Sequence, residues 1–438
     1  MLWQKNRRFF LFIMITMTML MMAGCGNEST EKPDVEITSS EETAGFFDEN
    51  DHAEAERIAA IFRDICDEAV NRNTWGNLDT IRRMVARLGE NGYVAVDSEN
   101  QVNMTRPGQV LEFCQAVDEK ENDEITIIVT TESGFRKFDL KTENGNVNIV
   151  RGYYQYGQNG DLKNQNMVSY SADFWQYTEE GYLIFEGSYF LDEDFALTLS
   201  DAQEYTALRV LPLDEKCREL NRRYILPVGY KQNNIFLCDW SEEDFGGLDF
   251  YDIFDRFYPM LHSQPVNFAA EESLEAGTVY QIPENIFENV ICTYFNVDME
   301  TLRLKTKYAS EHMAYEYRPR GVYEVEYPDI PYPEVVNYTE NQDGTITLNV
   351  NAVYPNGNTS KAFSHRTVIR PLNEDGFQYV SNERISLLSA DGKEEQPEHA
   401  LPEEDYNIWW HSDRLTEEEW QAVYGGADEK TEGVLSVP

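Results

Sequence analysis

Basic residues are scarce in this chain of 438 residues, in which 36 Lys and Arg stand against 79 Asp and Glu for a formal net charge of −43. Proteins that bind nucleic acid need basic side chains to neutralise phosphates, so the charge argues against nucleic acid as a partner. It also argues against attraction of the protein surface to anionic lipid. The surface favours cationic partners, divalent ions or simply solubility.

Motifs of common catalytic and metal-binding sites are lacking as well. No two of the six histidines have the i, i+4 spacing of a helical zinc site, and no two cysteines form a CxxC motif. The G-x-S-x-G motif of serine hydrolases and the glycine-rich loops that bind phosphate are also missing. We therefore predict no cofactor and no metal site, and we expect a protein that is not an enzyme.

Cysteine pairing cannot be deduced from the spacing. Five cysteines follow Cys25, and an odd number leaves at least one thiol free even in an export compartment. Cys66 and Cys114 fall on the apolar faces of expected helices, which predicts buried thiols.

Long apolar runs are lacking except near the N-terminus. Lys5, Arg7 and Arg8 precede an almost entirely apolar run of 14 residues, Phe9 to Met22. As a helix this run would be roughly 21 Å long, short of the ~30 Å hydrocarbon core of a bilayer. The pattern therefore predicts an export signal rather than a membrane-spanning helix.

The residues after this run resemble the lipobox of bacterial lipoproteins. Ala23 and Gly24 precede Cys25, and Met22 stands where that family usually has Leu. The resemblance implies that signal peptidase II removes residues 1–24 and that Cys25 carries a diacylglyceryl thioether. Two acyl chains hold a protein stably on a bilayer, so we expect an anchor in the cell membrane and a protein on its extracytoplasmic face. An ordinary signal peptide with a chance cysteine is the alternative.

Composition divides the rest of the chain into a tether, two domains and a tail. Residues 25–50 combine Cys25 with a polar, acidic stretch that has too little apolar surface for a core, so a flexible tether is expected. The remaining pattern predicts an α+β fold in which helices are followed by antiparallel meander sheets. We expect α+β domains at 51–265 and 266–390, and an acidic tail with a short helix at 391–438.

Apolar periodicity predicts three helices before the first sheet, at 52–71, 78–88 and 108–117. Hairpin turns are expected at Ser133-Gly134 and Asn144-Gly145, with strands on both sides. Later in this half, a strand from Asn234 to Trp240 and an aromatic helix at 250–261 are expected.

The second half repeats the order of helices followed by strands. Helices are expected at 282–295 and 298–308, and strands at 344–354, 361–372 and 376–385. This order, ending in DGFQYVSN, resembles the NTF2-like α+β cone over roughly residues 278–388, which implies a concave sheet that holds a small ligand or nothing. As a whole the chain resembles uncharacterised envelope lipoproteins of Gram-positive bacteria, a resemblance that implies no activity.

The tail carries one clear helix signal. Thr416 and Glu419 have the spacing of a capping box, and Leu415 and Trp420 flank them as a hydrophobic staple. A short helix is expected there, packing the tail back onto a domain.

The densest acidic group lies at 239–252. Asp239, Glu242 and Glu243 flank Trp240, and two carboxylates beside an aromatic ring are what glycoside hydrolysis requires. These three residues are the catalytic candidates of that hypothesis. With 79 carboxylates in the chain such a density arises by chance, so a solvated acidic turn is the preferred interpretation. The spacing does not fit a calcium loop.

Three functions remain open from the sequence. We favour a non-catalytic binding or interaction module of the cell envelope, with a cell-wall glycan, a cationic peptide or a protein as its partner. The alternatives are a glycan-directed hydrolase that uses residues 239–252 and a structural or assembly partner without a small ligand. No ligand-binding residue and no oligomeric state can be assigned.

Overall fold

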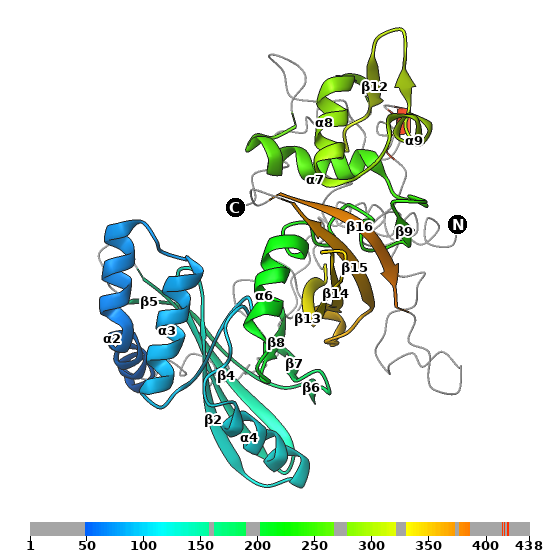
Figure 1. The fold of residues 1–438 in the computed structure, drawn as a ribbon. Helices are drawn as coiled ribbons and strands as arrows, with labels where there is room; N and C mark the ends of the chain where they lie inside the picture. Colours follow the sequence, from blue (N-terminus) through cyan, green and yellow to red (C-terminus); the bar gives the residue numbers. More distant parts are fainter. Residues whose placement is uncertain are drawn as a thin grey trace, which may run out of the picture. The chain divides into compact units, whose positions relative to one another are not determined.

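The computed structural model describes residues 49–156, 162–189, 202–266, 278–320, 330–372 and 376–385, together with Arg414, Thr416, Glu418 and Glu419. The chain divides into a unit at Met1–Phe47 and a second unit at Asp48–Pro438, and only the second is described. Within it, helices and mostly antiparallel sheets form an α+β fold, as predicted (Figure 1). In the described part of the chain, no helix is both long and apolar enough to cross a membrane.

The three helices expected before the first sheet are confirmed. They are α2 (Glu49–Arg72), α3 (Leu78–Glu90) and α4 (Pro107–Glu119). Four of the five residues of the predicted apolar stripe on α3 are buried, Ile81, Met84, Val85 and Leu88, whereas Leu78 is half-buried. Helix α4 begins at a proline, a residue that suits the first helical turn because its missing N–H has no partner there in any case.

The first sheet has the order β1-β2-β3-β4-β5. Its strands are β1 (Val94–Asp97), β2 (Asp123–Thr130), β3 (Gly134–Glu143), β4 (Asn146–Tyr156) and β5 (Leu162–Ser171). Strands β2 to β5 form the expected antiparallel meander. The turn at Asn144-Gly145 has φ values of +54° and +83°, which suit a two-residue hairpin.

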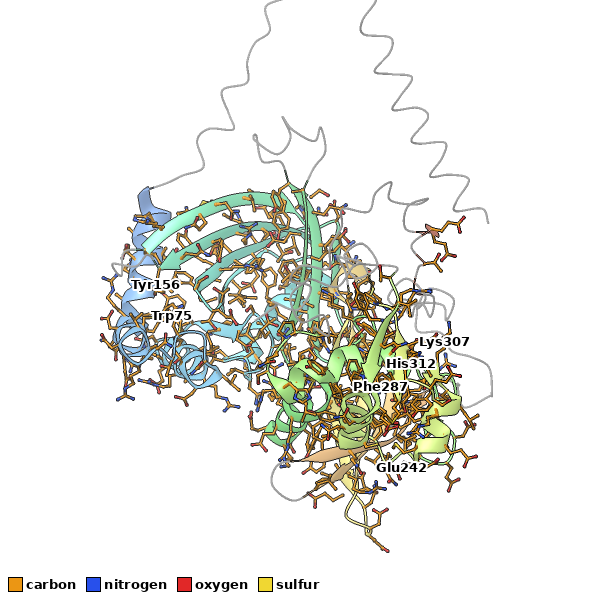
Figure 2. All side chains as sticks on the ribbon, turned by 90° about the horizontal axis from the view of Figure 1, so that it is seen from above. Trp75, Tyr156, Glu242, Phe287, Lys307 and His312 are labelled. Carbon is orange, nitrogen blue, oxygen red and sulfur yellow. The ribbon has the colours of Figure 1, made fainter. Side chains whose placement is uncertain are left out.

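Strand β1, which the sequence did not predict, pairs parallel with β2. A parallel pair needs a crossover connection, and α4 lies in it. Alternate residues of the pair belong to different cores: Val94 and Ile127 pack in the cluster with α4, whereas Ala95 and Ile128 pack in the cluster with α2 and α3. The sheet is therefore covered by helices on both faces. Trp75 closes the second cluster by packing edge-on against Tyr156 (Figure 2).

A three-stranded antiparallel sheet follows, with the order β6-β7-β8. Its strands are β6 (Phe174–Tyr177), β7 (Tyr182–Tyr189) and β8 (Ala202–Arg209). Leu183 and Phe185 of β7 pack in the cluster with α4, whereas Tyr182 and Ile184 pack against Val353 of the last sheet. Because side chains alternate along a strand, β7 joins two cores.

The remaining described chain contains five short helices and a tight turn of 3₁₀ type. The elements are α6 (Glu215–Leu220), the π-helix η1 (Asn221–Ile225), α7 (Phe250–His262), α8 (Glu284–Tyr294), α9 (Met299–Leu304) and η2 (Pro355–Gly357). Aspartates supply the N-caps of α6, α7 and α9: Asp214, Asp249 and Asp298 accept backbone N–H groups of the first turn.

Two sheets accompany these helices, with the orders β10-β12-β11 and β13-β14-β15-β16-β9. The strands are β9 (Trp240–Ser241), β10 (Tyr280–Pro283), β11 (Tyr308–Ala309), β12 (Ala314–Tyr317), β13 (Tyr332–Glu340), β14 (Ile346–Val353), β15 (Ser364–Pro371) and β16 (Phe377–Arg384). The predicted meander at 344–385 is confirmed as β14 to β16.

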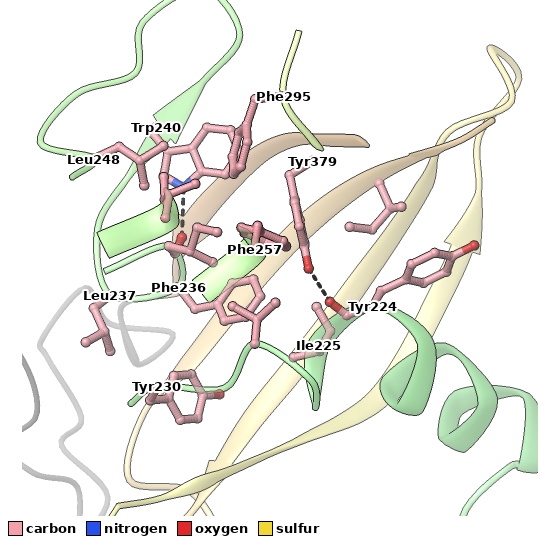
Figure 3. Packing of buried hydrophobic residues seen from close by; sticks show 14 of the residues in the cluster. Tyr224, Ile225, Tyr230, Phe236, Leu237, Trp240, Leu248, Phe257, Phe295 and Tyr379 are labelled. Atoms are coloured by element: carbon pink, nitrogen blue, oxygen red, sulfur yellow. Dashed lines mark hydrogen bonds between the residues drawn. The ribbon is translucent and has the colours of Figure 1, made fainter. Parts of the chain in front are cut away.

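An aromatic core holds this part together (Figure 3). Phe295 stacks on Tyr379 with ring centroids 5.6 Å apart, and Phe257 meets both rings. The Tyr379 hydroxyl donates to the carbonyl of Tyr224 at 2.5 Å. Buried residues from Leu213 to Tyr379 share this core, on both sides of the boundary expected at 265/266, and the two domain ranges stay a prediction.

The strand expected from Asn234 to Trp240 is wrong apart from its last residue, which begins β9. The side-chain amide of Asn234 donates to the carbonyl of Gly247 at 2.8 Å and accepts from the N–H of Asp249 at 3.0 Å. Such bonds offer the backbone an alternative to a strand ladder, so this apolar stretch forms turns.

Candidate functional site

A groove lies beside the start of the β1–β2 pair, under α4, with a volume of about 330 Å³. We call it the acidic groove and define it by Tyr93, Gln109, Glu112, Asp123 and Glu124. The parallel pairing brings the first residues of β1 and β2 to one end of the sheet, and the apolar face of α4 packs over them. The volume lies within the range of ligand pockets, roughly 300–1,000 Å³.

Charge in the acidic groove has one sign. Three of its defining residues are carboxylates exposed to solvent, and no Lys or Arg is among the described residues that line it. Lys141 is the cross-strand partner of Glu124 on β3 and forms an ion pair with Glu143. An arrangement of this kind attracts a cation and repels an anion.

A second polar centre is buried where β7 and β8 meet β13. Glu334 accepts hydrogen bonds from the Tyr182 hydroxyl at 2.8 Å and from Arg209 Nη1 at 2.7 Å. Asn100, in the loop after β1, accepts from the N–H of Arg209 and donates to the Tyr332 hydroxyl. We call this group, with Arg218, the polar seam. Burial raises the pKa of Glu334, and the positive charge of Arg209 opposes that rise.

Arg218 is the most unusual member of the polar seam. Its side chain on α6 is only 2% exposed, and none of its three guanidinium nitrogens has a hydrogen-bond partner among the described residues. Burial lowers the pKa of Arg218, and the carboxylates of Glu334 and Asp97 oppose this. The cavity that Arg218 lines measures about 10 Å³, which is about the room that one water molecule needs. The seam therefore suits a bridging water and is too small for a substrate.

A third polar centre lies on α7, where two aspartates hold Arg414. Nη2 of Arg414 donates to Asp252 Oδ1 at 2.5 Å and to Asp255 Oδ2 at 2.8 Å, while Nη1 donates to the carbonyl of Arg318 at 2.6 Å. The Arg414 guanidinium also lies 5.4 Å from the ring centre of Tyr317 and 5.9 Å from that of Tyr251. We call Tyr251, Asp252, Asp255 and Tyr317 the arginine slot.

The walls of the arginine slot are held by other residues. Arg320 binds both carboxylate oxygens of Asp252 at 2.8 Å, and the Tyr317 hydroxyl donates to Asp255 at 2.7 Å. Asp249 caps α7 one turn earlier, accepting from the N–H groups of Tyr251 and Asp252. Burial, and then the neighbouring Asp252 carboxylate, raise the pKa of Asp249 to about 6.

The three catalytic candidates of the hydrolase hypothesis have separate surroundings. Glu242 binds Arg370 through both oxygens at 2.5 and 2.7 Å, near the surface of the molecule (Figure 2). Asp239 accepts from the backbone N–H of Arg384 at 2.7 Å, and Glu243 is exposed.

The ring of Trp240, which the hydrolase hypothesis needs as a platform for sugar, is 4% exposed and packs in the aromatic core. Its Nε1 donates to the carbonyl of Ile235 at 2.7 Å (Figure 3). Glycan hydrolysis therefore stays a prediction from the sequence and gains no support from this geometry.

His365 lies in the core of the last sheet. Its Nε2 is 3.0 Å from the Tyr230 hydroxyl and its Nδ1 is 3.0 Å from Asn382 Oδ1. Burial lowers the pKa of His365 to about 3, so the imidazole is neutral and structural. Within the described ranges, no three His, Cys, Asp or Glu side chains are grouped so that they could hold a metal ion.

The five cysteines after Cys25 are free thiols in the structure. Burial raises the pKa of Cys66 and of Cys114 to about 12, which suits unreactive core residues. Cys25 itself lies outside the described residues.

Sequence reasoning missed most of these groups. The acidic stretch predicted at 239–252 includes Asp249 and Asp252, but neither Asp255 nor the arginine of this slot was predicted. Tail residue Arg414 lies two positions before Thr416, the first residue of the predicted capping box. The reciprocal bonds of the box are present: the N–H of Thr416 donates to Glu419, and the N–H of Glu419 donates to the Thr416 hydroxyl. That position was the only signal available.

Comparison with known proteins gives one match. Residues 48–400 match the sequence profile of a family described as "Family of unknown function (DUF6070)". No curated protein and no solved structure matches the chain.

Proposed function

Because the chain belongs to the DUF6070 family of unknown function, we propose a role from its own geometry: it is a lipid-anchored module of the cell envelope that binds a cationic partner without catalysis. The observation that carries this proposal is the acidic groove, about 330 Å³ in volume, whose described lining includes three carboxylates and no basic residue. Its size suits a side chain or a short segment of a cationic peptide.

Electrostatics supports this choice of partner. Glu112, Asp123 and Glu124 are exposed to solvent. A Lys or Arg of a partner can therefore approach them without breaking a buried ion pair. The net charge of −43 adds a long-range attraction, which speeds encounter with a cationic partner and weakens with salt. Tyr93 adds an aromatic face on which a cation can stack.

The place of action follows from the N-terminal sequence. A diacylglyceryl thioether on Cys25 would hold the protein on the extracytoplasmic face of the membrane. Two acyl chains suffice for a stable membrane anchor. Replacing Cys25 with Ala tests it: the wild-type protein should incorporate an azido fatty acid and sediment with membranes, whereas C25A should do neither. A wild-type protein that takes up no label would contradict the anchor.

Binding is tested with the full-length protein in detergent and a fluorescent nona-arginine peptide. We compare the wild type with a groove variant that carries Glu112→Gln, Asp123→Asn and Glu124→Gln. The matched control carries Glu179→Gln, Glu311→Gln and Glu340→Gln, three exposed carboxylates outside the groove with the same change in charge.

Fluorescence anisotropy should show at least a tenfold weaker affinity for the groove variant and less than a twofold change for the control. Each measurement is repeated over a salt series, because a purely long-range effect disappears at high salt. An equal loss of affinity in both variants would mean that the peptide responds to the overall charge of the protein, and the groove would not be its binding site.

A further inference from the structure

The arginine slot binds a side chain that comes from far along the sequence. Arg414 and Asp252 are 162 positions apart. Residues 386–413 separate Arg414 from Ile385, the residue that follows strand β16. The Arg414 side chain is nevertheless only 9% exposed in the slot. We propose that the slot is a recognition site for an arginine side chain, filled here by Arg414, and that an arginine presented by a cationic peptide enters it by displacing Arg414.

The chemistry of the slot selects a guanidinium group. Arg414 donates in two directions, from Nη2 to the carboxylates of Asp252 and Asp255 and from Nη1 to a carbonyl. Two tyrosine rings lie within 6 Å of its cationic carbon. A planar guanidinium can bind carboxylates and stack on rings at the same time, whereas the ammonium group of lysine is a compact point charge.

The walls of the slot also have hydrogen bonds of their own. Asp252 accepts two bonds from Arg320, Asp255 accepts from the Tyr317 hydroxyl, and Asp249 caps α7. None of these bonds involves Arg414. A site whose walls are already in place spends little binding free energy on ordering them.

Charge balance determines how the slot can be emptied. With Arg414 in place, Arg320 and Arg414 face Asp249, Asp252 and Asp255. Without Arg414, Arg320 is the guanidinium that remains among the described residues against these three carboxyl groups, two of which, Asp252 and Asp255, line the slot itself. A buried charge left unpaired is strongly destabilising, so departure of Arg414 favours entry of another cation over an empty slot.

The test is chemical rescue of the emptied slot in the full-length protein. Arg414→Ala should lower the melting temperature, and Nα-acetyl-arginine amide should raise it again in a saturable way. Nα-acetyl-lysine amide at the same concentrations is the control for charge. On the background of Arg414→Ala, replacing Asp255 with Asn should weaken the rescue at least tenfold, measured as the concentration at half effect.

Arg414→Lys provides the second measurement if Arg414→Ala does not fold. Lysine keeps the charge but not the fork of donors, so an arginine-containing peptide should bind Arg414→Lys at least tenfold more tightly than the wild type. Combined with Arg414→Ala, the three groove substitutions of the previous section should leave the half-effect concentration of the arginine amide unchanged, which separates this proposal from the proposed function.

Three results would overturn the proposal. They are equal rescue by the arginine and lysine amides, rescue that persists with Asp255→Asn, and no gain in peptide affinity for Arg414→Lys. Failure of both Arg414 variants to fold would have the same effect, since a slot that cannot be vacated is a structural anchor.

Discussion

The hydroxyl of Tyr182 on β7 donates to Glu334 on β13 at 2.8 Å, across 152 positions of sequence. The bond belongs to the polar seam, in which the β1 loop, β7, β8 and α6 meet β13. Arg209 closes the seam on the other oxygen of Glu334. One carboxylate thus neutralises Arg209, accepts from Tyr182 and lies near Arg218, so many contacts depend on it.

Glu334→Gln should be strongly destabilising. The change keeps the shape of the side chain but leaves Arg209 and Arg218 buried without their shared counter-charge. Removal of one partner of a buried pair typically costs about 3–5 kcal/mol in the free energy of unfolding. Urea denaturation followed by circular dichroism measures the loss.

A matched control for Glu334 is Glu383→Gln, which breaks the exposed ion pair between Glu383 and Arg366. Exposed pairs contribute about 0–1 kcal/mol, so this variant should unfold close to the wild-type midpoint. Similar losses in the two variants would show that burial of the polar seam does not matter to stability.

Asp249→Asn should change how stability depends on pH. The fold raises the pKa of Asp249 to about 6, so the folded protein binds this proton more tightly than the unfolded chain does. The contribution of this proton to the free energy of unfolding is therefore fully present below about pH 4, near the ordinary pKa of an aspartate. It is lost as the pH rises through 6. A shift of one pKa unit corresponds to about 1.4 kcal/mol, so the free energy of unfolding changes by at most about 3 kcal/mol over this pH range.

Asparagine keeps the cap of α7 through its side-chain oxygen, so a comparison of Asp249→Asn with the wild type isolates the charge. Unfolding free energies measured at pH 4, 5, 6 and 7 should give the variant a growing relative advantage as pH rises. Parallel curves would contradict the raised pKa.

His365→Gln should have the opposite effect on the pH dependence. The fold lowers the pKa of His365 to about 3, whereas a histidine in the unfolded chain takes up its proton near pH 6.5. Stability from this group is therefore complete above about pH 6.5 and falls by about 1.4 kcal/mol for each pH unit below it. The same denaturation series should show a flatter acid limb for the variant. An unchanged slope would mean that the imidazole is not buried in its neutral form.

Gly134→Ala should destabilise the first sheet. A methyl group at Gly134 would lie 1.9 Å from the carbonyl oxygen of Tyr154, and neither backbone can move without breaking the β3–β4 ladder. Overpacking of this kind costs about 1–3 kcal/mol. Gly108→Ala in α4 is the control, because nothing lies within 4 Å of its added carbon. That variant should be more stable than the wild type by up to about 1 kcal/mol, because alanine has the higher helix propensity. Thermal unfolding should therefore show a lower melting temperature for Gly134→Ala and an equal or higher one for Gly108→Ala.

Local features of the fold could be predicted from the sequence because their causes are local. The turn at Asn144-Gly145 follows from two residues that tolerate positive φ, and the stripe on α3 follows from helical spacing. Strand β1 was missed because its four residues are all buried and show no alternation. The turns at 234–240 were missed because the run is apolar like a strand, whereas the side-chain amide of Asn234 binds the carbonyl of Gly247 and stabilises turns instead.

Long-range pairings among charged residues could not be predicted. Each acidic residue has many basic candidates along the chain, and only the folded structure shows that Glu334 binds Arg209 or that Asp252 binds Arg320 and Arg414. The acidic groove was equally invisible, since its lining comes from the residues around the start of β1, from α4 and from β2, and only the fold brings these three segments together. The acidic composition left a cationic partner, divalent ions and solubility open, and it did not indicate where a partner would bind.

The parallel β1–β2 pair also bears on the order in which the molecule is assembled. Every residue that lines the acidic groove lies between Gly92 and Thr126, so the groove closes a short loop and forms at low entropic cost. The contact of Arg414 with Asp252 closes a loop of 162 positions and has nothing local to nucleate it. We therefore expect the groove to form early in folding and the arginine slot to be filled last, so that exchange of Arg414 reverses only the final step and leaves the groove intact.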